Sequence, residues 1–557
     1  MNKYSSERKR LQAQGQIPSW MTTQGYQLFI EKYLWSDSVK QQYETIAKTA
    51  AQYVEHIWPE AYEKFFNLLW NGWLSPSTPI LANMGTTRGL PVSCSGGYIE
   101  DSIDGFYTAR RETAILTKYG FGTSGYLGDI RGRGSEISVG GRASGVLPVF
   151  KGFVRDMQEV SQGATRRGAW AGYLPIEHSD FDELCDFLHH YPDDLNVGWN
   201  VSDAFISKLE NGDDEALRRY QKALKVKMIT GKGYFFFVDK VNSQRPLSYK
   251  IRELDVKASN LCTEITLHSS KEYTYTCVLS SMNVAKYDEW KDTDAVRWAT
   301  IFLDCVAEDF IQKAKNIPGL EKAVAFTEKG RALGLGQCGL HTYLQSKGIP
   351  FDSLSAQWES NSIARHIKLE ADNTSLEMAV KLNSPEWCLD NKRNTHLIAI
   401  APTKSTSLIM GGVSEGINPD PAMVFTQNTA GGEVERITPI FLQLMKDKGV
   451  YDSKHIREIE DAFGSVQHVD WLTPEEKAVF KTAFEMDMNA IIRMAAGRQD
   501  YIDQAQSINL FFSGDADENY ISEVHKNAFK NENILSLYYC YSKSNVSGSK
   551  GECTSCM

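Results

Sequence analysis

The chain has 557 residues, of which 42% are hydrophobic and 23% charged, and its formal charge is −10 at pH 7. Such a composition is typical of a globular protein, and the length suffices for two or three lobes with large cores. The acidic balance argues against a protein that coats nucleic acid, because such proteins are normally basic. A local pocket with a few Lys or Arg side chains can still bind a nucleotide.

The sequence contains no run of eighteen or more apolar residues, so we expect no membrane span. The charged start, residues 1–10, is not followed by an apolar segment and is therefore not a secretory signal. Ten cysteines in a chain of this length do not make a disulfide scaffold. A reducing, cytoplasmic location fits this composition best.

The first seventy residues are predicted to be helical, because apolar side chains recur there at steps of three and four. These side chains are Tyr43, Ile46, Ala50, Tyr53 and Ile57. Residues 96–172 are rich in glycine, and we expect strands and tight loops in which the backbone approaches a ligand closely.

The middle of the chain alternates apolar strands with helical stretches, which predicts α/β architecture. Residues 233–238 (GYFFFV) are one such strand, and a helix is expected after Asp294. Further on, Thr473, Pro474 and Glu476 have the order of a helix cap, a first helical residue and a third-position glutamate. This order predicts a helix start.

The most informative stretch is NLCTE at residues 260–264. In an extended segment alternate residues share a face, so Asn260, Cys262 and Glu264 are expected to surround one small volume. A carboxylate raises the pKa of a neighbouring thiol and so disfavours the thiolate. The pair is better suited to chemistry in which a neutral sulfur exchanges hydrogen atoms while the carboxylate transfers a proton. The alternative is a buried structural cysteine beside a solvated glutamate.

Further motifs accompany this stretch. Cys94 ends the sequence PVSC, and Cys277 lies in TCVLSSMN. Residues 402–407 (PTKSTS) form a hydroxyl-rich turn after the apolar run at 397–400. The hydroxyls and backbone N–H groups of such a turn can cradle a phosphate.

Residues 542–557 differ from the rest, because a polar, flexible segment leads to Cys553 and Cys556 near the end. Random-coil scaling gives such a linker an r.m.s. span of roughly 20 Å for about twelve residues. A dithiol on this tether can visit a buried site and withdraw. The alternatives are a frayed end and half of a zinc site, although structural zinc needs four ligands and no second Cys/His pair is close in sequence.

Taken together, these motifs resemble the large, catalytic subunit of class I ribonucleotide reductase, from about Leu74 to the last residue. Each motif is short, and the resemblance rests on their common order and spacing. The matching motifs are STP at 77–79, SC at 93–94, NLCTE at 260–264, APTKSTS at 401–407, YIDQAQS at 501–507 and LYY at 537–539.

The resemblance implies an α/β fold: a ten-stranded α/β barrel of two antiparallel half-barrels, with a central finger loop that carries Cys262. We expect a helical N-terminal region at residues 1–70, the barrel at 71–541 and a flexible redox tail at 542–557. Many relatives carry an N-terminal ATP-cone that switches activity. Its basic, glycine-containing opening is absent from this sequence, so we expect no dATP off-switch in this chain.

By the same resemblance, the chain reduces ribonucleoside diphosphates to deoxyribonucleoside diphosphates, the precursors of DNA. Cys262 is expected to become a transient thiyl radical that abstracts the 3′ hydrogen of the ribose. Glu264 is expected to act as general base on the 3′-hydroxyl, and Asn260 to hold the ribose hydroxyls. Cys94 and Cys277 match the pair that ends each turnover as a disulfide.

The tail is expected to complete the redox cycle. Cys553 and Cys556 resemble the dithiol that reduces the internal pair by exchange and is itself reduced by thioredoxin or glutaredoxin. The residues expected to bind substrate are Thr78, Ser93, Asn260, Glu264, Pro402, Thr403, Ser405, Thr406 and Ser407.

The adjacent pair Tyr538 and Tyr539 assigns the class, although ordinary packing is the alternative for two tyrosines. In class I enzymes such a pair relays a radical from a separate, metal-containing small (beta) subunit. We therefore expect no metal and no cofactor bound in this chain. The alternatives are an adenosylcobalamin-dependent (class II) reductase and an inactive nucleotide-binding paralogue; loss of Cys94, Cys262 or Glu264 would mark such a paralogue, and all three are present.

The resemblance also implies an effector site for a dNTP or ATP at the interface of a homodimer. Lys and Arg suit a triphosphate, and Asp can accept from a ribose hydroxyl, although solvated surface charge is the alternative for the arginines. The loop at 161–168 resembles the one that reports effector identity to the substrate base. The expected effector residues are Asp101, Ser102, Ile103, Lys118, Arg131, Gln162, Arg166 and Arg167.

Overall fold

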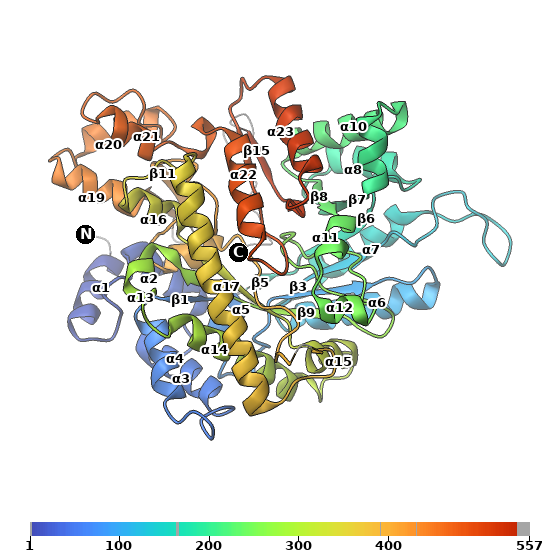
Figure 1. Cartoon of the computed structure of the whole chain (residues 1–557), viewed down its shortest axis with the longest axis horizontal. Coiled ribbons are helices and arrows are strands. Elements are labelled where there is room, and N and C mark those ends of the chain that lie inside the picture. The colour runs from blue at the N-terminus through green and yellow to red at the C-terminus, as the bar shows by residue number, and fades with distance from the viewer. Residues whose placement is uncertain (1–2, 163–165, 390, 430–431, 543–557) are drawn as a thin grey trace.

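The computed structural model describes residues 3–162, 166–389, 391–429 and 432–542. The N-terminal part is helical, as predicted, and lies at one side of the molecule (Figure 1, blue). Its helices are α1 (Lys3–Ala13), α2 (Thr23–Leu28), the π-helical turn η1 (Phe29–Tyr33), α3 (Val39–Ala51) and α4 (Ala61–Trp70).

Helix α3 carries the predicted apolar face, on which Tyr43, Ile46 and Ala50 are buried. The prediction is wrong at the end of the helix, because α3 stops before Tyr53 and Ile57. Both residues lie in tight turns and still pack against the core from there. The apolar repeat in the sequence therefore still marks residues that contact the core, although the helix itself has ended.

Five parallel strands form the first half of a barrel, in the order β2, β3, β6, β7 and β8. Their bounds are β2 (Cys94–Tyr98), β3 (Gly122–Tyr126), β6 (Trp170–Pro175), β7 (Val197–Val201) and β8 (Tyr234–Phe237). Parallel neighbours need long crossovers, which here contain helices. These are α6 (Ile103–Lys118), α7 (Val146–Glu159), α8 (Phe181–His190), α9 (Asp203–Glu210) and α10 (Asp214–Thr230).

The second half of the barrel follows β9 (Tyr275–Asn283), with which β10 (Leu333–Cys338) pairs in parallel. Two extended segments, 396–400 and 504–508, and the strand β14 (Ser536–Leu537) continue it. The backbone hydrogen bonds that join them run from Leu335 N to Leu397 O at 2.8 Å, from Ile400 N to Ala505 O at 3.1 Å and from Tyr538 N to Ile508 O at 2.9 Å.

Two antiparallel seams close the ring. At one seam β9 pairs with β2, and at the other β14 pairs with β8. Within the described residues the ring thus consists of eight strands and two extended segments, five in each half. The predicted ten-stranded barrel of two antiparallel half-barrels is confirmed. The short strand β1 (Leu74–Pro76) lies outside the ring and pairs with the end of β9.

The prediction for residues 96–172 is partly wrong, because helices α6 and α7 occupy much of this region. Its strand glycines accommodate aromatic rings instead of a ligand. A Cβ on Gly172 would lie 2.5 Å from the Phe150 ring, and one on Gly96 would lie 2.3 Å from the Tyr275 ring. Both distances are far below van der Waals contact, so glycine is needed for the close packing of the sheet.

The other predicted elements are confirmed. The GYFFFV segment contains β8, and helix α14 (Ala295–Ala314) follows Asp294. Helix α21 (Pro474–Val479) begins with a capping box, in which Thr473 and Glu476 exchange hydrogen bonds.

The remaining elements surround the barrel. The helices are α5 (Thr78–Asn83), α11 (Val238–Gln244), α12 (Leu247–Ile251), α13 (Tyr287–Trp290), α15 (Glu321–Gly330), α16 (Leu340–Ser346), α17 (Leu354–Leu382), α18 (Lys404–Ile409), α19 (Pro439–Asp447), α20 (Ser453–Asp461), α22 (Met488–Gln499) and α23 (Glu518–Lys530), with 3-10 turns η2 (Val284–Lys286) and η3 (Ala483–Glu485). Three small sheets pair β4 (Ser161–Gln162) with β5 (Arg166–Arg167), β11 (Val424–Thr429) with β12 (Gly432–Ile437), and β13 (Leu510–Phe512) with β15 (Cys540–Ser542).

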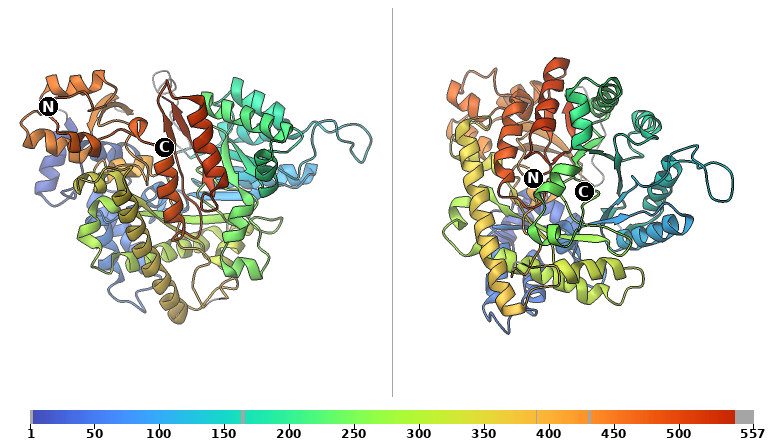
Figure 2. Two further views of the ribbon diagram at one scale, coloured as in Figure 1. Left: turned by 45° about the horizontal axis from the view of Figure 1, so that its top comes forward. Right: turned by 45° about the vertical axis from the view of Figure 1, so that its right-hand side comes forward.

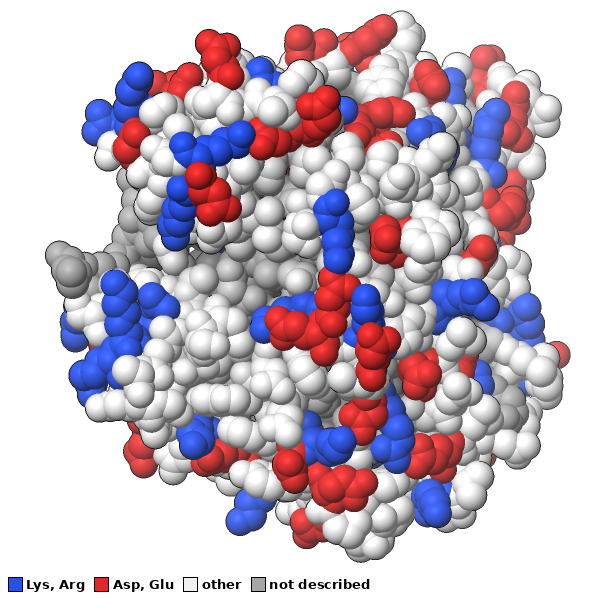
Figure 3. Space-filling view, turned by 60° about the vertical axis from the view of Figure 1, so that its left-hand side comes forward, with Lys and Arg blue, Asp and Glu red and all other residues white. Residues whose placement is uncertain are grey.

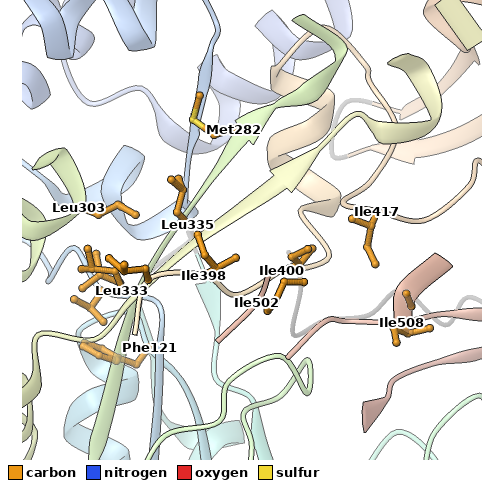
Figure 4. Packing of buried hydrophobic residues seen from close by; sticks show 14 of the residues in the cluster. Phe121, Met282, Leu303, Leu333, Leu335, Ile398, Ile400, Ile417, Ile502 and Ile508 are labelled. Carbon is orange, nitrogen blue, oxygen red and sulfur yellow. The ribbon is translucent and has the colours of Figure 1, made fainter. Parts of the chain in front are cut away.

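The main core lies between the outside of the barrel wall and the helices that cover it, and it continues into the N-terminal helices. Leu333, Leu335, Ile398 and Ile400 are fully buried, and Figure 4 shows them on neighbouring segments of the ring. Helix α14 is buried along most of its length, and the long helix α17 packs on it from outside (Figure 1). The right-hand view of Figure 2 places α17 at the edge of the molecule. The barrel wall is therefore apolar on its outer side, as in other sheets covered by helices.

The surface carries both signs of charge. On the face shown in Figure 3, acidic and basic side chains are interspersed without a continuous basic stripe. This face offers no extended electropositive track for a nucleic-acid backbone. Among the described residues, no helix combines the length and the apolar character that a membrane crossing requires.

Helix α2 of the N-terminal region rests on α18, the helix that carries most of the PTKSTS motif. Gly25 makes this contact: a Cβ there would lie 2.8 Å from Leu408 O and 3.0 Å from Ile409 O. Both are backbone atoms, so neither can swing aside as the end of a side chain would. The missing side chain at Gly25 therefore sets how closely the two helices approach.

We expect Gly25→Ala to lower the free energy of unfolding by about 1–3 kcal/mol, because overpacking outweighs the gain in helix propensity. Urea denaturation of the two proteins measures this difference. Gly97→Ala is the matched control, since its Cβ would meet only the Thr274 hydroxyl, at 3.8 Å. Equal midpoints for Gly25→Ala and the unsubstituted chain would contradict the role assigned to the contact.

Candidate active site

The NLCTE stretch is a loop between α12 and β9 that enters the barrel. Side chains from both half-barrels hold its backbone. Tyr173 Oη, on β6, donates to Asn260 O at 2.5 Å, and Ser507 Oγ, from the second half, donates to Cys262 O at 2.6 Å. The loop therefore has the position of the predicted finger, with Cys262 inside the barrel.

The extended geometry predicted for this stretch is wrong. Thr263 has a φ of 67°, in the left-handed region, so the alternation of a strand does not apply. Cys262 and Glu264 nevertheless line one cleft, and Asn260 Nδ2 lies 3.5 Å from Cys94 Sγ. A turn, and not alternation, gathers the three predicted side chains.

A cleft beside Cys262 opens to solvent. The predicted substrate residues that line it are Thr78, Ser93, Glu264, Pro402, Thr403, Ser405 and Thr406. Cys94 and Cys262 line it as well, and so do residues that the sequence analysis missed: Ser75, Ser77, Lys404, Ser280 and Ser281.

Ser407 does not line the cleft. Its hydroxyl is buried and lies 2.7 Å from Thr403 Oγ1, which also accepts a hydrogen bond from Gly416 N at 2.8 Å. Thr403 has a φ of 53° where α18 begins. Ser407 therefore holds the shape of the turn, while the neighbouring hydroxyls face the cleft.

The hydroxyls of Ser77, Ser93 and Ser280, which line the cleft, are buried and have no hydrogen-bond partner among the described residues. Buried hydroxyls in folded proteins normally have a partner, so these three need one from outside the chain. They indicate that the cleft binds a polar molecule.

The electrostatics of the cleft centre on Glu264, which is 1% exposed. Burial raises the pKa of this carboxyl to about 7, although hydrogen bonds from its own backbone, Asn260 and Ser507 act in the opposite direction. Ser507 Oγ lies 3.2 Å from Glu264 Oε2. A carboxyl with this pKa can both accept and release a proton near neutral pH.

Cys94 and Cys277 occupy directly paired positions on β2 and β9, at one seam of the barrel. Paired residues of an antiparallel ladder have Cα atoms about 4.5–5.5 Å apart, which is within disulfide reach. Each sulfur receives an amide N–H at 3.5 Å, Cys94 from Asn260 and Cys277 from Gln504. Burial raises the pKa of the Cys277 thiol, so this sulfur keeps its proton.

An aromatic cluster reaches Cys262 from the other seam. Tyr538 Oη lies 3.5 Å from Cys262 Sγ, and the Tyr538 and Tyr539 rings are 4.2 Å apart between centroids. Tyr234 on β8 packs on both, at 5.0 and 5.6 Å. The two predicted tyrosines thus form a contact path that ends at the thiol.

Lys227 on α10 is a further residue of this cluster that the sequence analysis missed. Its ammonium is buried and donates to Tyr538 O and, at 3.2 Å, to Gly233 O. Burial lowers its pKa to about 8. Lys227 therefore fixes the backbone beside Tyr538, a role that nothing in the surrounding helical sequence marks.

The predicted effector residues lie in two places. Asp101, Ser102 and Ile103 are at the start of α6, and Arg131 Nε lies 2.6 Å from Asp101 Oδ2. Lys118 is at the other end of α6, roughly 22 Å away along the helix axis. Within one chain Lys118 therefore lies away from Asp101, Ser102 and Ile103, at the end of α6 that packs against the hairpin of β4 and β5.

Gln162 and Arg166 are paired across β4 and β5, and Arg167 is the next residue on β5. The predicted tail cysteines, Cys553 and Cys556, lie outside the described residues. In the described part of the chain, no group of three or more His, Cys, Asp or Glu side chains is arranged to hold a metal ion.

Gln504 and Ser507 were also without a predicted role. Gln504 reaches Cys277 and also donates to Leu333 O at 2.9 Å, while Ser507 contacts the loop and Glu264. Both belong to the YIDQAQS motif, so its presence was the available signal. The contacts of Gln504 with Cys277 and of Ser507 with the finger loop exist only in the folded barrel, so the motif alone does not indicate them.

A barrel of two antiparallel half-barrels, with a cysteine loop at its centre facing a cysteine pair, defines the ribonucleotide reductases, and the chain belongs to this family. The family's barrel-domain model ("Ribonucleotide reductase, barrel domain") matches residues 92–225, 215–387 and 389–540. Its all-alpha domain model ("Ribonucleotide reductase, all-alpha domain") matches residues 19–89.

Within this family the chain is a ribonucleoside-diphosphate reductase large subunit. It is 32% identical to the large subunit proposed for Frog virus 3 (isolate Goorha), over 89% of this chain and 93% of that protein. It is 29% identical to a vitamin B12-dependent ribonucleoside-diphosphate reductase of Mycobacterium tuberculosis (strain CDC 1551 / Oshkosh), over 84% of this chain and 70% of that protein. The solved Actinobacillus ureae class Id ribonucleotide reductase alpha subunit is 37% identical, with a TM-score of 0.87 over 95% of this chain and 99% of that one.

Replacing Glu264 by Gln keeps a hydrogen-bonding side chain and removes the ionisable carboxyl. The pKa of Glu264 is raised from 4.5 to about 7 in the folded chain. Above pH 4.5 the unfolded chain therefore gives up this proton more readily than the folded chain does, and the folded state loses stability. The unsubstituted chain should therefore lose stability relative to Glu264→Gln as the pH rises from 4.5 through 7. The loss should reach about 3 kcal/mol by pH 8.

Urea denaturation of both proteins at pH 5 and pH 8 measures this difference. Glu55→Gln is the control, because Glu55 is exposed and its loss should leave the pH dependence unchanged. If the free energies of unfolding of Glu264→Gln and the unsubstituted chain change equally between pH 5 and pH 8, the raised pKa of Glu264 is wrong.

Proposed function

We propose that the chain reduces ribonucleoside diphosphates by thiyl-radical chemistry at Cys262. The observation that carries the proposal is the position of Cys262 Sγ, 3.5 Å from Tyr538 Oη and on one cleft with Glu264 and Cys94. A group that can exchange a hydrogen atom with the sulfur, a base and a reductant thus surround the same space.

The reaction exchanges a C2′–O bond for a C2′–H bond. The Cys262 thiyl removes the 3′ hydrogen atom, and Glu264 takes the 3′-hydroxyl proton while the C2′–O bond breaks. The 2′-hydroxyl takes a proton from one thiol of the Cys94–Cys277 pair and leaves as water. The pair then gives a hydrogen atom to C2′ and an electron to C3′ and becomes joined by an S–S bond, while Glu264 returns its proton to the 3′ oxygen. The 3′ hydrogen then returns from Cys262. Overall, a dithiol and a C–OH become a disulfide, a C–H and water.

The protonation states in the cleft support these roles. The buried Cys277 thiol keeps the hydrogen that the reduction consumes, because burial raises its pKa. Glu264, with a pKa of about 7, can accept a proton at neutral pH. Asn260, which bonds Cys94 in the free chain, is proposed to turn its amide to the ribose hydroxyls when substrate is bound.

The proposed diphosphate site is the PTKSTS turn, which lines the cleft together with Cys262 and Glu264 of the finger loop. Thr403, Lys404, Ser405 and Thr406 offer one ammonium and three hydroxyls there. A cation and several hydroxyl donors suit phosphate oxygens. The unpartnered hydroxyls described above add polar contacts for the rest of the nucleotide.

The contact path through Tyr539 and Tyr538 supports class I, in which a metal-containing small subunit supplies the radical. Likeness to the class Id alpha subunit supports the same class. The second candidate is an adenosylcobalamin-dependent reductase, favoured by the similarity to the B12-dependent enzyme of Mycobacterium tuberculosis. In that case the tyrosines would serve packing.

We also propose a homodimer with an effector dNTP or ATP at its interface. Because Lys118 lies far from Asp101 and Arg131 within one chain, a second copy would have to supply it. Helix α6 exposes Ile103 and Tyr107, which are 72% and 63% accessible. Such apolar side chains at one end of α6 suit a helix that packs on its counterpart. The paired strands with Gln162, Arg166 and Arg167 would carry the effector signal.

The class assignment predicts which radical source supports turnover. The purified chain with a diphosphate, an effector and dithiothreitol should form deoxynucleotide when the small subunit from the same genome is added, and should not do so with adenosylcobalamin. Cys262→Ser should bind nucleotide and form no product, a loss of at least about 1,000-fold, because the hydroxyl hydrogen is too strongly bound for this exchange. Product formation is measured by chromatography.

Two results would contradict parts of this proposal separately. Turnover with adenosylcobalamin alone would keep the cleft chemistry and reject class I. Measurable turnover by Cys262→Ser would reject the thiyl assignment itself.

For the chain as a whole we propose a helical region at 1–70, the barrel at 71–541 and a redox tail at 542–557. The double variant Cys553→Ser, Cys556→Ser should keep dithiothreitol-supported turnover and lose turnover driven by thioredoxin, because a small thiol reaches the Cys94–Cys277 disulfide without the tail. Parallel assays with the two reductants measure this. Loss of both activities would show that the tail does more than carry electrons.

A further inference from the structure

A third tyrosine continues the row of aromatic rings beyond Tyr539. The Tyr541 ring lies 5.6 Å from the Tyr539 ring, at an interplanar angle of 36°. On its other side, Tyr541 stacks on Phe511, at 5.1 Å and 19°. Tyr541, Tyr539, Tyr538 and the Cys262 thiol therefore form one continuous row of contacts.

Exposure falls along this row toward the thiol. Tyr541 is partly exposed, Tyr539 is 8% exposed and Tyr538 is 1% exposed. Strand β15 fixes the outer end, because Tyr541 pairs in register with Phe511 of β13. The row thus has an outer end at the surface and an inner end at the reacting sulfur.

The sequence YYCY explains why Tyr541 joins the row. Tyr539 and Tyr541 are two residues apart, so they lie on the same side of an extended backbone. Cys540 between them is buried on the other side, where its Sγ lies 3.3 Å from Met228 Sδ. Alternation therefore places two aromatic rings, and not the thiol, on the side of the relay.

Besides Tyr538 and Tyr541, Tyr234 also packs on Tyr539, and the centroids of these two rings are likewise 5.6 Å apart. It is completely buried on β8 and so cannot meet a second protein. Of the two rings that flank Tyr539 at equal distance, Tyr541 is the one that reaches the surface.

We propose that Tyr541 is the first residue of this chain to be oxidised and that it passes the radical to Tyr539. The inference rests on the proposed class I function, because the oxidant is the one-electron oxidised centre of the small subunit. It adds one tyrosine to the predicted pair and locates the surface at which the small subunit must approach.

Each step moves one electron and one proton. The O–H bond of Tyr541 breaks, and its electron and proton go to the oxidised centre of the partner. The Tyr541 phenoxyl then takes an electron and a proton from the Tyr539 hydroxyl, which leaves a phenoxyl at Tyr539. Tyr538 follows in the same way, and finally the S–H bond of Cys262 breaks. The steps reverse when the 3′ hydrogen has returned to the substrate.

The test uses the full chain with 3-aminotyrosine, which is oxidised more easily than tyrosine, at position 541, 539 or 520. Each protein is mixed with the small subunit, a diphosphate and an effector, and the radical is measured by electron paramagnetic resonance. We expect an aminotyrosyl radical at 541 and at 539. Tyr520 is the control, because it packs on Phe512, next to Phe511 on β13, and lies outside the row.

Turnover gives a second measurement. Tyr541→Phe keeps the ring stack and removes the O–H bond, so we expect at least a tenfold loss of turnover with unchanged nucleotide binding. Tyr520→Phe should stay within twofold of the unsubstituted chain. Full turnover by Tyr541→Phe, or a radical at 539 with none at 541, overturns the inference and leaves the proposed function in place. A radical at neither position overturns the proposed class I function and the inference with it.

Discussion

The anchoring of the finger loop inside the barrel is the constraint on which the site depends. Its carbonyl groups accept hydrogen bonds from Tyr173 in one half and Ser507 in the other, so the loop is fixed only where the two halves meet. Burial at that position sets the protonation states: it raises the pKa of Glu264 to about 7, and it raises the pKa of the Cys277 thiol, which keeps its hydrogen. The same burial that disfavours an ion makes the sulfur suitable for hydrogen-atom transfer.

The two seams of the barrel separate the two groups of residues for which we propose redox roles. At the β2–β9 seam lie the paired Cys94 and Cys277, the proposed source of electrons for the substrate. At the β8–β14 seam, Tyr538 follows one strand and Tyr234 lies on the other, so the aromatic cluster stands on the opposite side of the loop. Cys262 lies between them. The antiparallel arrangement thus keeps the proposed one-electron path and the proposed two-electron reductant apart, on opposite sides of Cys262.

The barrel and the cleft residues could be predicted from the family motifs in the sequence. Local patterns of residue types predicted only single helices and strands. The capping box at Thr473 and the strand at 233–238 were read from residue types, since neighbouring residues determine them. The turn at Thr263 could not be predicted in this way, because its left-handed φ depends on the distant side chains that anchor the loop and not on the residues of the loop itself. Lys227 was missed for a related reason: its carbonyl partner on Tyr538 lies 311 positions further along the chain.

The closing strand has a consequence for how the molecule is made. Strand β14 both completes the ring and leads directly into Tyr538, which meets Cys262 across 276 positions of sequence. Loop closure over such a distance comes late in folding. A nascent chain that has not released residues 536–541 from the ribosome has neither a closed barrel nor a tyrosine at the thiol. The proposed radical path is therefore completed by the same residues that close the barrel around it.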